Sequence, residues 1–271
     1  MTGVDGTSFH ERQLPASTSP SGVTYVDAHV KVLNEKVVEH AKRRGMDVLI
    51  YAPHFTRIED ARSQATRYSD STLLIIPARE VFTGSWRNRQ HILLVGLKTG
   101  IPDFITLEAA ISAARKQDAA ILVPHPLFLN VSLKRPSLQQ FESTIHAVER
   151  CNYKLPLYAN QRAEECYTAY DVSGFGSSYA HLPGSVGAVW TAFNESLDSE
   201  AAVVAAFQKM TPRRIQQTDG YAHMMQKYKE FGHFVYENTW QKVDRLVLSG
   251  REATHPSHEM YDNRFDEASV Y

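Results

Sequence analysis

Short apolar runs alternate with amphipathic segments along most of this chain. Between residues 23 and 195 the apolar runs are nearly continuous, which is typical of strands that are buried on both faces. The segments between them carry apolar residues at helical spacing, and capping residues bound some of them, such as Asn34 before one segment, Gly45 after it and Thr106 before another. This alternation of strand and helix predicts a mainly parallel sheet with crossover helices.

The pattern places each element within a few residues. The segments predicted as strands or strand ends are 24–32, 46–54, 71–80, 91–97, 118–126, 147–152, 174–181 and 187–193. The segments predicted as helices are 34–45, 58–68, 107–117, 137–151, 160–170, 198–210 and 221–248.

The pattern also divides the chain into three parts. Residues 1–22 are rich in Ser, Thr, Pro and Gly and are predicted to be a flexible leader, without the apolar stretch of a secretory signal. Residues 23–195 are predicted to form one α/β barrel. Residues 196–271 are predicted to be a helical C-terminal extension that packs on the barrel and ends in a tail on its surface.

Charge, cysteine content and hydropathy narrow the choice of partners and compartment. The formal net charge is −1, so no global basic field attracts nucleic acid, and only a local basic patch would do so. The two cysteines, Cys151 and Cys166, suggest reduced thiols in a cytoplasmic protein. No apolar run approaches the roughly 18 residues needed to span a membrane, so no membrane partner is expected.

The first strand carries an unusual set of polar side chains. Because alternate residues of a strand share a face, Asp27, His29 and Lys31 point to the same side. This set is either a strand edge that faces water or part of a functional site. Five other apolar runs favour the second interpretation, because each of these five begins or ends with a side chain that can ligate a metal. The six candidate metal ligands are His29, His54, Glu80, His91, His125 and His181.

These six side chains are expected to meet at one place. In a parallel α/β barrel the carboxyl ends of the strands converge on one mouth, where active sites are built. A cage of imidazoles with one carboxylate suits Zn²⁺, Mn²⁺ or Fe²⁺ better than Ca²⁺ or Mg²⁺. The sequence therefore predicts a transition-metal site at the barrel mouth.

The order of these motifs resembles that of the polymerase-and-histidinol-phosphatase (PHP) family of metal-dependent phosphoesterases. The family pattern is D-L-H-x-H, T-D-H, P-G-x-E, H-I-L-x-x-G, H-P, I-E-x-x-N and G-S-D-A-H. This chain has D-A-H-V-K at 27–31, A-P-H at 52–54, P-A-R-E at 77–80, H-I-L-L-V-G at 91–96, H-P at 125–126, V-E-R-C-N at 148–152 and S-S-Y-A-H at 177–181. The resemblance implies a distorted β/α barrel of seven strands with up to three metals at its mouth.

The chain departs from the family at several ligand positions. Lys31 replaces the second His of the opening motif, Pro53 and Tyr179 replace two Asp residues, and Val37 stands where a further His is usual. The resemblance implies that one complete ligand set remains, and it consists of Glu80, His91 and His125. The remnants of two other sets are His29 with Glu80, and His54 with His181. One or two bound metals are therefore expected.

The role of Lys31 has three interpretations at this point. Its ammonium cannot ligate a metal while protonated. It either replaces the charge of a missing metal and binds phosphate, or neutralises Asp27 and Glu80 in a site that has lost its chemistry. A third interpretation is carbamylation of Lys31, which would turn it into a ligand.

Four other polar residues are candidates for contact with a substrate. Arg79 is expected to assist phosphoryl transfer together with Lys31. Arg87 and Arg89, in the loop before His91, either clamp a phosphate or remain solvated. Asn160 either reaches the mouth or caps a backbone group.

Two classes of function follow from the resemblance. The first is hydrolysis of a phosphate ester, either a small phosphomonoester, a nucleotide or an oligonucleotide end, by metal-activated water. The second is a degraded barrel that acts as a binding or scaffold protein, for example in an RNA–protein assembly, as a protein subunit of ribonuclease P does. The oligomeric state cannot be derived from the sequence.

Overall fold

The computed structural model describes residues 22–85, 88–128, 131–154, 160–161, 163–165, 169, 172–218 and 253–270. The predicted leader up to residue 21, Arg87 and the predicted helix 221–248 lie outside the described residues, as does much of the predicted helix 160–170.

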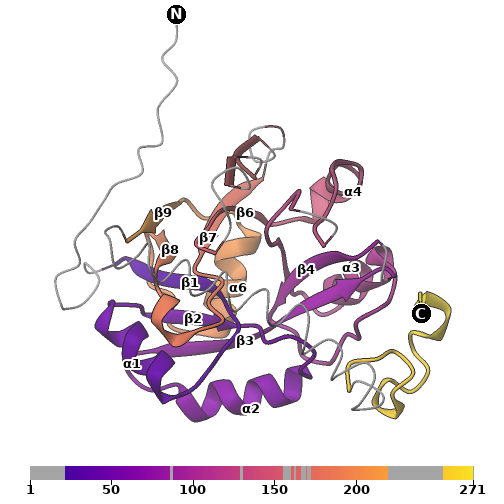
Figure 1. Ribbon diagram of the computed structural model, residues 1–271, viewed down its shortest axis with the longest axis horizontal. Helices are drawn as coiled ribbons and strands as arrows, with labels where there is room; N and C mark the ends of the chain where they lie inside the picture. Colours follow the sequence, from indigo (N-terminus) through magenta and orange to yellow (C-terminus); the bar gives the residue numbers. More distant parts are fainter. Residues whose placement is uncertain are drawn as a thin grey trace, which may run out of the picture.

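One sheet organises the described part of the chain (Figure 1). Its strands are β1 (Thr24–Val30), β2 (Val48–Tyr51), β3 (Leu74–Thr83), β4 (Gln90–Val95), β5 (Ala120–Val123), β6 (Ala147–Asn152), β7 (Ser173–Ser177), β8 (Val189–Phe193) and β9 (Arg213–Gln217). The strand order is β7-β6-β5-β4-β3-β2-β1-β8-β9. A parallel bridge between Val30 and Ala180 joins the end of β1 to the residues after β7, so the sheet nearly closes into a barrel.

The sheet differs from the predicted one in strand number and direction. It has nine strands within the described residues, whereas seven were expected. The prediction of a mainly parallel sheet is wrong, because β3 pairs antiparallel with β4, β4 with β5, β8 with β1, and β9 with β8. The connection between β3 and β4 is too short for a crossover helix and makes a hairpin instead.

Helices cover the outside of the sheet (Figure 1). The described α-helices are α1 (Glu35–Arg43), α2 (Ile58–Tyr68), α3 (Leu107–Arg115), α4 (Arg135–Phe141) and α6 (Glu200–Gln208), and the short 3-10 turns are η1 (Glu142–Thr144), η2 (Pro183–Ser185), η5 (Glu259–Tyr261) and η6 (Asp266–Ala268). The predicted caps are confirmed, because the side chain of Asn34 accepts from the Val37 amide at 3.1 Å and that of Thr106 accepts from the Ala109 amide at 3.2 Å.

Two segments near helices were predicted incorrectly. The helix predicted over 137–151 ends at Phe141, and the chain enters β6 at Ala147 after a 3-10 turn. The amide of His146 donates to the carbonyl of Ile121 at 2.9 Å, so pairing with β5 overrides the helical pattern. Beyond residue 195, α6 forms as predicted, but β9 adds a strand to the sheet where only a helical extension was expected.

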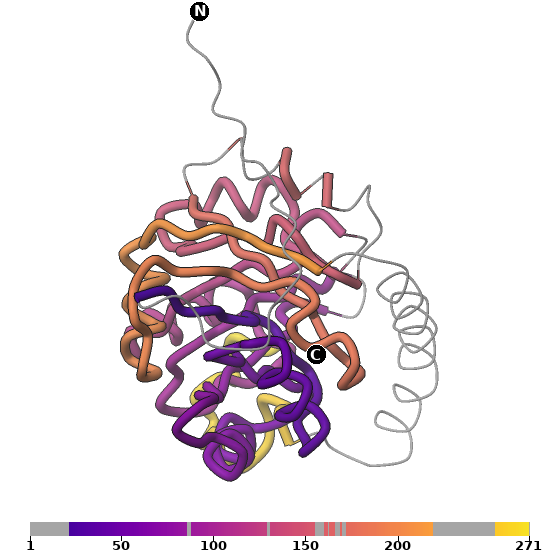
Figure 2. Tube along the Cα trace, turned by 90° about the vertical axis from the view of Figure 1, so that its left-hand side faces the viewer, coloured from indigo at the N-terminus to yellow at the C-terminus, as the bar shows by residue number. Residues whose placement is uncertain are grey.

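The C-terminal segment 253–270 packs against the loop that follows β4 (Figures 1 and 2). The Asp103 amide donates to the Thr254 carbonyl at 2.8 Å, and the Val270 amide donates to the Phe104 carbonyl at 3.0 Å. Tyr261 is buried in this contact. The segment is therefore bound to the barrel by backbone hydrogen bonds and an apolar anchor.

Candidate metal centre

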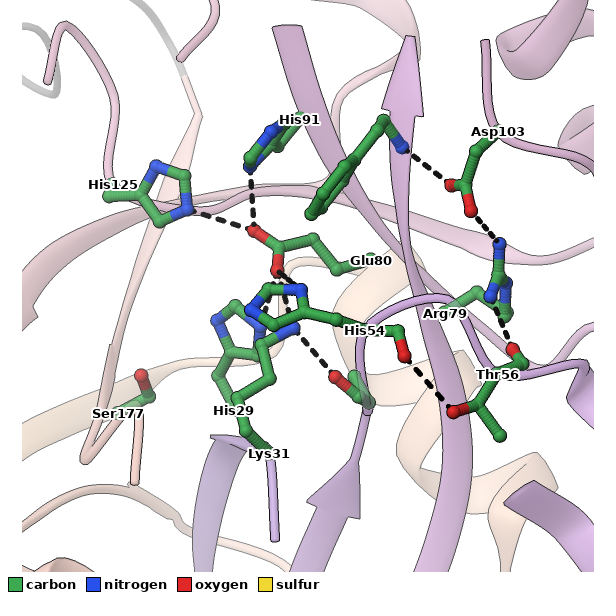
Figure 3. Close-up of polar contacts among 12 residues, drawn as sticks. His29, Lys31, His54, Thr56, Arg79, Glu80, His91, Asp103, His125 and Ser177 are labelled. Atoms are coloured by element: carbon green, nitrogen blue, oxygen red, sulfur yellow. Dashed lines mark hydrogen bonds and ion pairs between the residues drawn. The ribbon is translucent and has the colours of Figure 1, made fainter. Parts of the chain in front are cut away.

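Glu80 is the centre of the candidate site. It lies within β3, is fully buried, and points into the nearly closed sheet (Figure 3). The antiparallel register pairs Glu80 with Leu93 and Phe82 with His91, so the beginning of β4 lies at the mouth beside the carboxyl ends of the parallel strands. This explains why the candidate ligand His91 precedes the apolar run of β4, whereas His54 and His125 follow theirs.

One oxygen of Glu80 faces two imidazoles. Glu80 Oε1 lies 2.9 Å from His125 Nε2 and 3.2 Å from His91 Nδ1. The ligand atoms of these three residues all lie within 4.8 Å of one another. Ligands that surround Zn²⁺ tetrahedrally at about 2.0–2.1 Å are roughly 3.3 Å apart, so this group has nearly the spacing of a ligand set.

The other oxygen of Glu80 faces a second group (Figure 3). Glu80 Oε2 accepts a hydrogen bond from Lys31 Nζ and lies 3.3 Å from His54 Nδ1. His29 Nε2 is 3.7 Å from the same oxygen, which is too long for a hydrogen bond. Lys31 also donates to the Ala52 carbonyl at 2.6 Å. The structure thus places Lys31 as the direct counter-charge of Glu80.

His181 joins this side of the cluster through ring contacts. Its ring centroid is 5.5 Å from that of His54 and 4.9 Å from that of Tyr179. The Tyr179 ring is also 4.7 Å from the His29 ring, and its backbone has a φ of 47°, which is unusual for a residue other than glycine. All six predicted metal-ligand candidates therefore lie in one cluster.

Burial sets the protonation of the cluster. Burial lowers the pKa of His29 to about 3 and that of His91 to about 4, and it also lowers the pKa of His54. Burial alone would raise the pKa of Glu80, but the charge of Lys31 and the nearby imidazoles hold it well below its usual range. Near neutral pH the site therefore holds a charged Glu80 carboxylate and neutral imidazoles at His29, His54 and His91, which are the protonation states that metal ligands need.

Polar groups outside the cluster hold His125 in place. Ser132 Oγ lies 3.0 Å from His125 Nδ1, which leaves Nε2 to face Glu80. The buried carboxylate of Glu149 accepts from the His125 amide at 2.6 Å, while the His125 backbone has a φ of 33°. Sequence reasoning missed both partners. Glu149 lies within the quoted V-E-R-C-N motif, whereas nothing in the pattern indicated Ser132.

A divalent cation fits this donor set. Among the described residues, His91 Nε2 and both ring nitrogens of His29 are buried without a hydrogen-bond partner. A buried polar atom without a partner is unfavourable. Such a cation would be held by Glu80, His91 and His125, the one ligand set that is complete.

The remaining predicted site residues lie elsewhere or have other partners. Arg79 precedes Glu80 in the sequence and is buried. Its guanidinium forms an ion pair with Asp103 at 2.9 Å and not with the residues of the cluster. Asn160 accepts from the Asn152 amide at 3.0 Å and donates to its carbonyl, which is the capping alternative. Arg89 is buried just before β4, and burial lowers its pKa.

Lys154 is a cation near the site that sequence reasoning missed. It is buried two residues after the end of β6, and its Nζ lies 5.3 Å from the centroid of the Tyr179 ring. Lys31 Nζ lies 5.7 Å from the same centroid. The only feature of the sequence that could have indicated Lys154 was its position two residues after Asn152 of the V-E-R-C-N motif.

Comparison with known proteins gives one family match and several structural relatives. A family model described as PHP-associated matches residues 158–212. The fold is similar to that of PsfC from Pseudomonas syringae PB-5123, with a TM-score of 0.57, 17% identity, and coverage of 82% of this chain and 98% of that one.

A second structural relative comes from Bacteroides vulgatus and is a two-domain protein containing a predicted PHP-like metal-dependent phosphoesterase. It has a TM-score of 0.54 and 16% identity, and the match covers 83% of this chain and 74% of that one. No curated protein sequence matches this chain. At these identities the two structures establish a shared fold.

Proposed function

We propose that this chain is a member of the PHP domain family that binds a divalent metal and hydrolyses a phosphate ester, a proposal supported by the PHP-associated family match at residues 158–212 and by the fold shared with a predicted PHP-like phosphoesterase. The observation that carries the proposal is the buried group of Glu80, His91 and His125, whose ligand atoms lie within 4.8 Å of one another. One carboxylate and two imidazoles favour Zn²⁺, Mn²⁺ or Fe²⁺. When bound, such a cation supplies Lewis acidity toward a phosphoryl oxygen and lowers the pKa of a water.

The protein's own residues then bind and orient the substrate. Glu80 and the two imidazoles would hold the cation at a buried position, and Ser132 contacts Nδ1 of His125 and so orients its ring. Lys31, with its buried ammonium beside Glu80, offers a fixed positive charge to a phosphoryl oxygen that reaches the mouth. His29, His54 and His181 hold a second cation or the phosphoryl oxygens.

The substrate contacts beyond the cluster are less extensive than the sequence suggested. Arg79 is held by Asp103, so we assign it no contact with phosphate. Arg87 and Arg89 remain proposed phosphate contacts in the loop before β4. The proposed substrates are a small phosphomonoester, a nucleotide or an oligonucleotide end, all of which present the same phosphoryl oxygens to the mouth.

The ion pair between Lys31 and Glu80 favours a second candidate function. An ammonium that already neutralises the central carboxylate removes part of the attraction for a cation. A barrel in this state would act as a binding or scaffold protein, for example in an RNA–protein assembly. The near-zero net charge provides little electrostatic attraction for RNA.

Metal analysis separates the two candidates. Protein purified without chelator is expected to contain Zn, Mn or Fe by elemental analysis and to hydrolyse p-nitrophenyl phosphate or a 3′-phosphorylated oligonucleotide. His91→Ala and His125→Ala are each expected to lower the metal content to near zero, while the control His40→Ala on α1 leaves it unchanged. If the parent contains metal and both cluster variants contain as much, the site has been placed at the wrong residues. Metal-free, inactive parent protein would favour the scaffold.

A further inference from the structure

The second half of β3 has an unusual neighbour on one of its edges. The parallel pairing with β2 ends where Tyr51 faces Pro77, and beyond that point no strand of the described residues pairs with this edge. The loop after β4 takes its place, because the Phe104 amide donates to the Phe82 carbonyl at 2.6 Å and the Gly84 amide donates to the Ile105 carbonyl at 2.8 Å.

Asp103 joins this loop to β3 at two points. Its Oδ1 accepts from the Phe82 amide at 2.9 Å, and its Oδ2 accepts from Arg79 Nη2 at 2.9 Å. The side chains of Arg79 and Asp103 are each only 1% exposed. Because neighbouring residues of a strand point to opposite faces, Arg79 is directed away from the metal-facing side that Glu80 occupies.

Two contact paths lead from this pair to the cluster, and Figure 3 labels the residues of the first. In the first, Arg79 Nη1 donates to the Thr56 carbonyl, and Thr56 Oγ donates to the His54 carbonyl at 3.1 Å. In the second, Asp103 accepts from the backbone amide of Phe82. The ring of Phe82 stacks on the His91 ring with centroids 3.9 Å apart and an interplanar angle of 3°. The same ring meets His54 edge-on at 5.2 Å.

Stability alone is a weak reason for such a pair. A buried ion pair recovers its desolvation penalty only in part, and apolar replacements of similar volume are often as stable. An arginine that is neutralised by one carboxylate can use its other guanidinium nitrogen to hold the backbone of a neighbouring segment. Here the segments are the loop that carries His54 and the part of β3 that supports His91.

We propose that Arg79 and Asp103 are positioning residues that set the placement of His54 and His91 in the metal cluster from the opposite face of β3. The C-terminal segment braces this unit, because the Thr254 carbonyl accepts from the Asp103 amide at 2.8 Å and the Ala268 carbonyl accepts from the Thr106 amide at 2.9 Å. The effect on metal binding rests on the proposed function, whereas the placement of the imidazoles does not.

The chain offers a control for Arg79 that has the same kinds of partner but a more exposed side chain, 41% exposed for Arg62 against 1% for Arg79. Arg62 likewise pairs with a carboxylate, that of Glu200 at 2.7 Å, and donates to a backbone carbonyl, that of Leu97 at 2.8 Å. It joins α2 to the region of α6 and has no contact with the cluster. Arg79→Met and Arg62→Met therefore each remove an arginine with the same two kinds of partner.

The test measures histidine placement and metal affinity separately. In the metal-free protein, carbethoxylation of each histidine by diethyl pyrocarbonate is followed by peptide mass spectrometry, with His40 as internal reference. Arg79→Met is expected to raise the modification rate of His54 severalfold, and Arg79→Lys to restore part of the protection. In a Co²⁺ titration, Arg79→Met is expected to weaken binding about 10–100-fold, as the loss of an outer-shell partner usually does. Arg62→Met should leave both quantities as in the parent.

The outcomes distinguish the positioning role from the proposed function. A parent protein that binds no Co²⁺ contradicts the metal site, and the histidine modification rates still decide the positioning role. A folded Arg79→Met protein with parental His54 reactivity overturns the positioning role. If Arg79→Met does not fold, Thr56→Val decides, because it removes only the hydroxyl bond to His54 and should raise the reactivity of His54 without changing that of His91.

Discussion

Replacing Lys31 by Met tests whether its ammonium is the counter-charge of Glu80. The side chains of Lys31 and Glu80 are 3% and 0% exposed, so the pair is buried. Removing one partner of a buried ion pair typically destabilises a protein by about 3–5 kcal/mol, because the other charge is left without compensation. In the metal-free protein, Lys31→Met should therefore lower the free energy of unfolding by about that amount.

A bound cation should reverse this loss. The variant lacks an ammonium that repels a divalent cation, so its affinity for Co²⁺ or Mn²⁺ should be higher than that of the parent. A bound metal stabilises the folded state by an amount that grows with affinity, and each tenfold gain in affinity adds about 1.4 kcal/mol at saturating metal. The difference in stability between variant and parent should therefore shrink by about that amount when the metal is added.

Urea unfolding of chelator-treated and metal-saturated protein measures both effects. Lys42→Met is the control, since Lys42 pairs with Asp70 at the surface and its loss should change stability by less than about 1 kcal/mol. A metal-free Lys31→Met protein as stable as the parent would refute the counter-charge role. Loss of metal binding would instead identify Lys31 as a modified ligand, and a phosphate affinity lowered roughly tenfold to a hundredfold would support its contact with substrate.

Two further predictions follow from the protonation and support of the cluster. The pKa values of His29 and His91 are lowered to about 3 and about 4, so their neutral forms stabilise the fold above the unfolded pKa of about 6.5, and this contribution is lost as the pH falls below it. Metal-free protein should lose up to about 1.4 kcal/mol per pH unit for each of these histidines between pH 6.5 and 4, and equal urea midpoints at pH 7 and 5 would contradict this expectation. Ser132→Ala removes the partner of His125 Nδ1 and should weaken Co²⁺ binding about tenfold in a calorimetric titration, and unchanged affinity would show that the serine does not orient the ring.

The sequence predicted that the six candidate side chains lie together better than it predicted the strand directions of the sheet. These candidates are visible because each lies near the beginning or the end of an apolar run. Strand direction is different, since an apolar run such as that of β4 reads the same in a parallel and an antiparallel pairing. The sequence Arg213–Gln217 has no apolar alternation at all, and it becomes β9 only because β8 offers an edge to pair with.

Arg79 shows what the sequence contained but the prediction did not use. Adjacent residues of a strand face opposite sides, so Arg79 and Glu80 could not both line the mouth. Its partner, Asp103, follows the next strand and could not be identified without the fold. The position of Lys31 beside Glu80 was one of the alternatives left open, and only the three-dimensional distances favour it.

The closure of the sheet has a consequence for folding kinetics. The bridge that joins Val30 to Ala180 connects residues about 150 positions apart, and the candidate ligands are spread over the same span. Contacts between such distant residues require a large loss of chain entropy and tend to form late. A cation held by residues from β3, β4 and the end of β5 would then gain its ligands mainly after the main folding barrier. Metal binding should therefore slow unfolding while leaving the folding rate nearly unchanged, which makes the cation a source of kinetic stability.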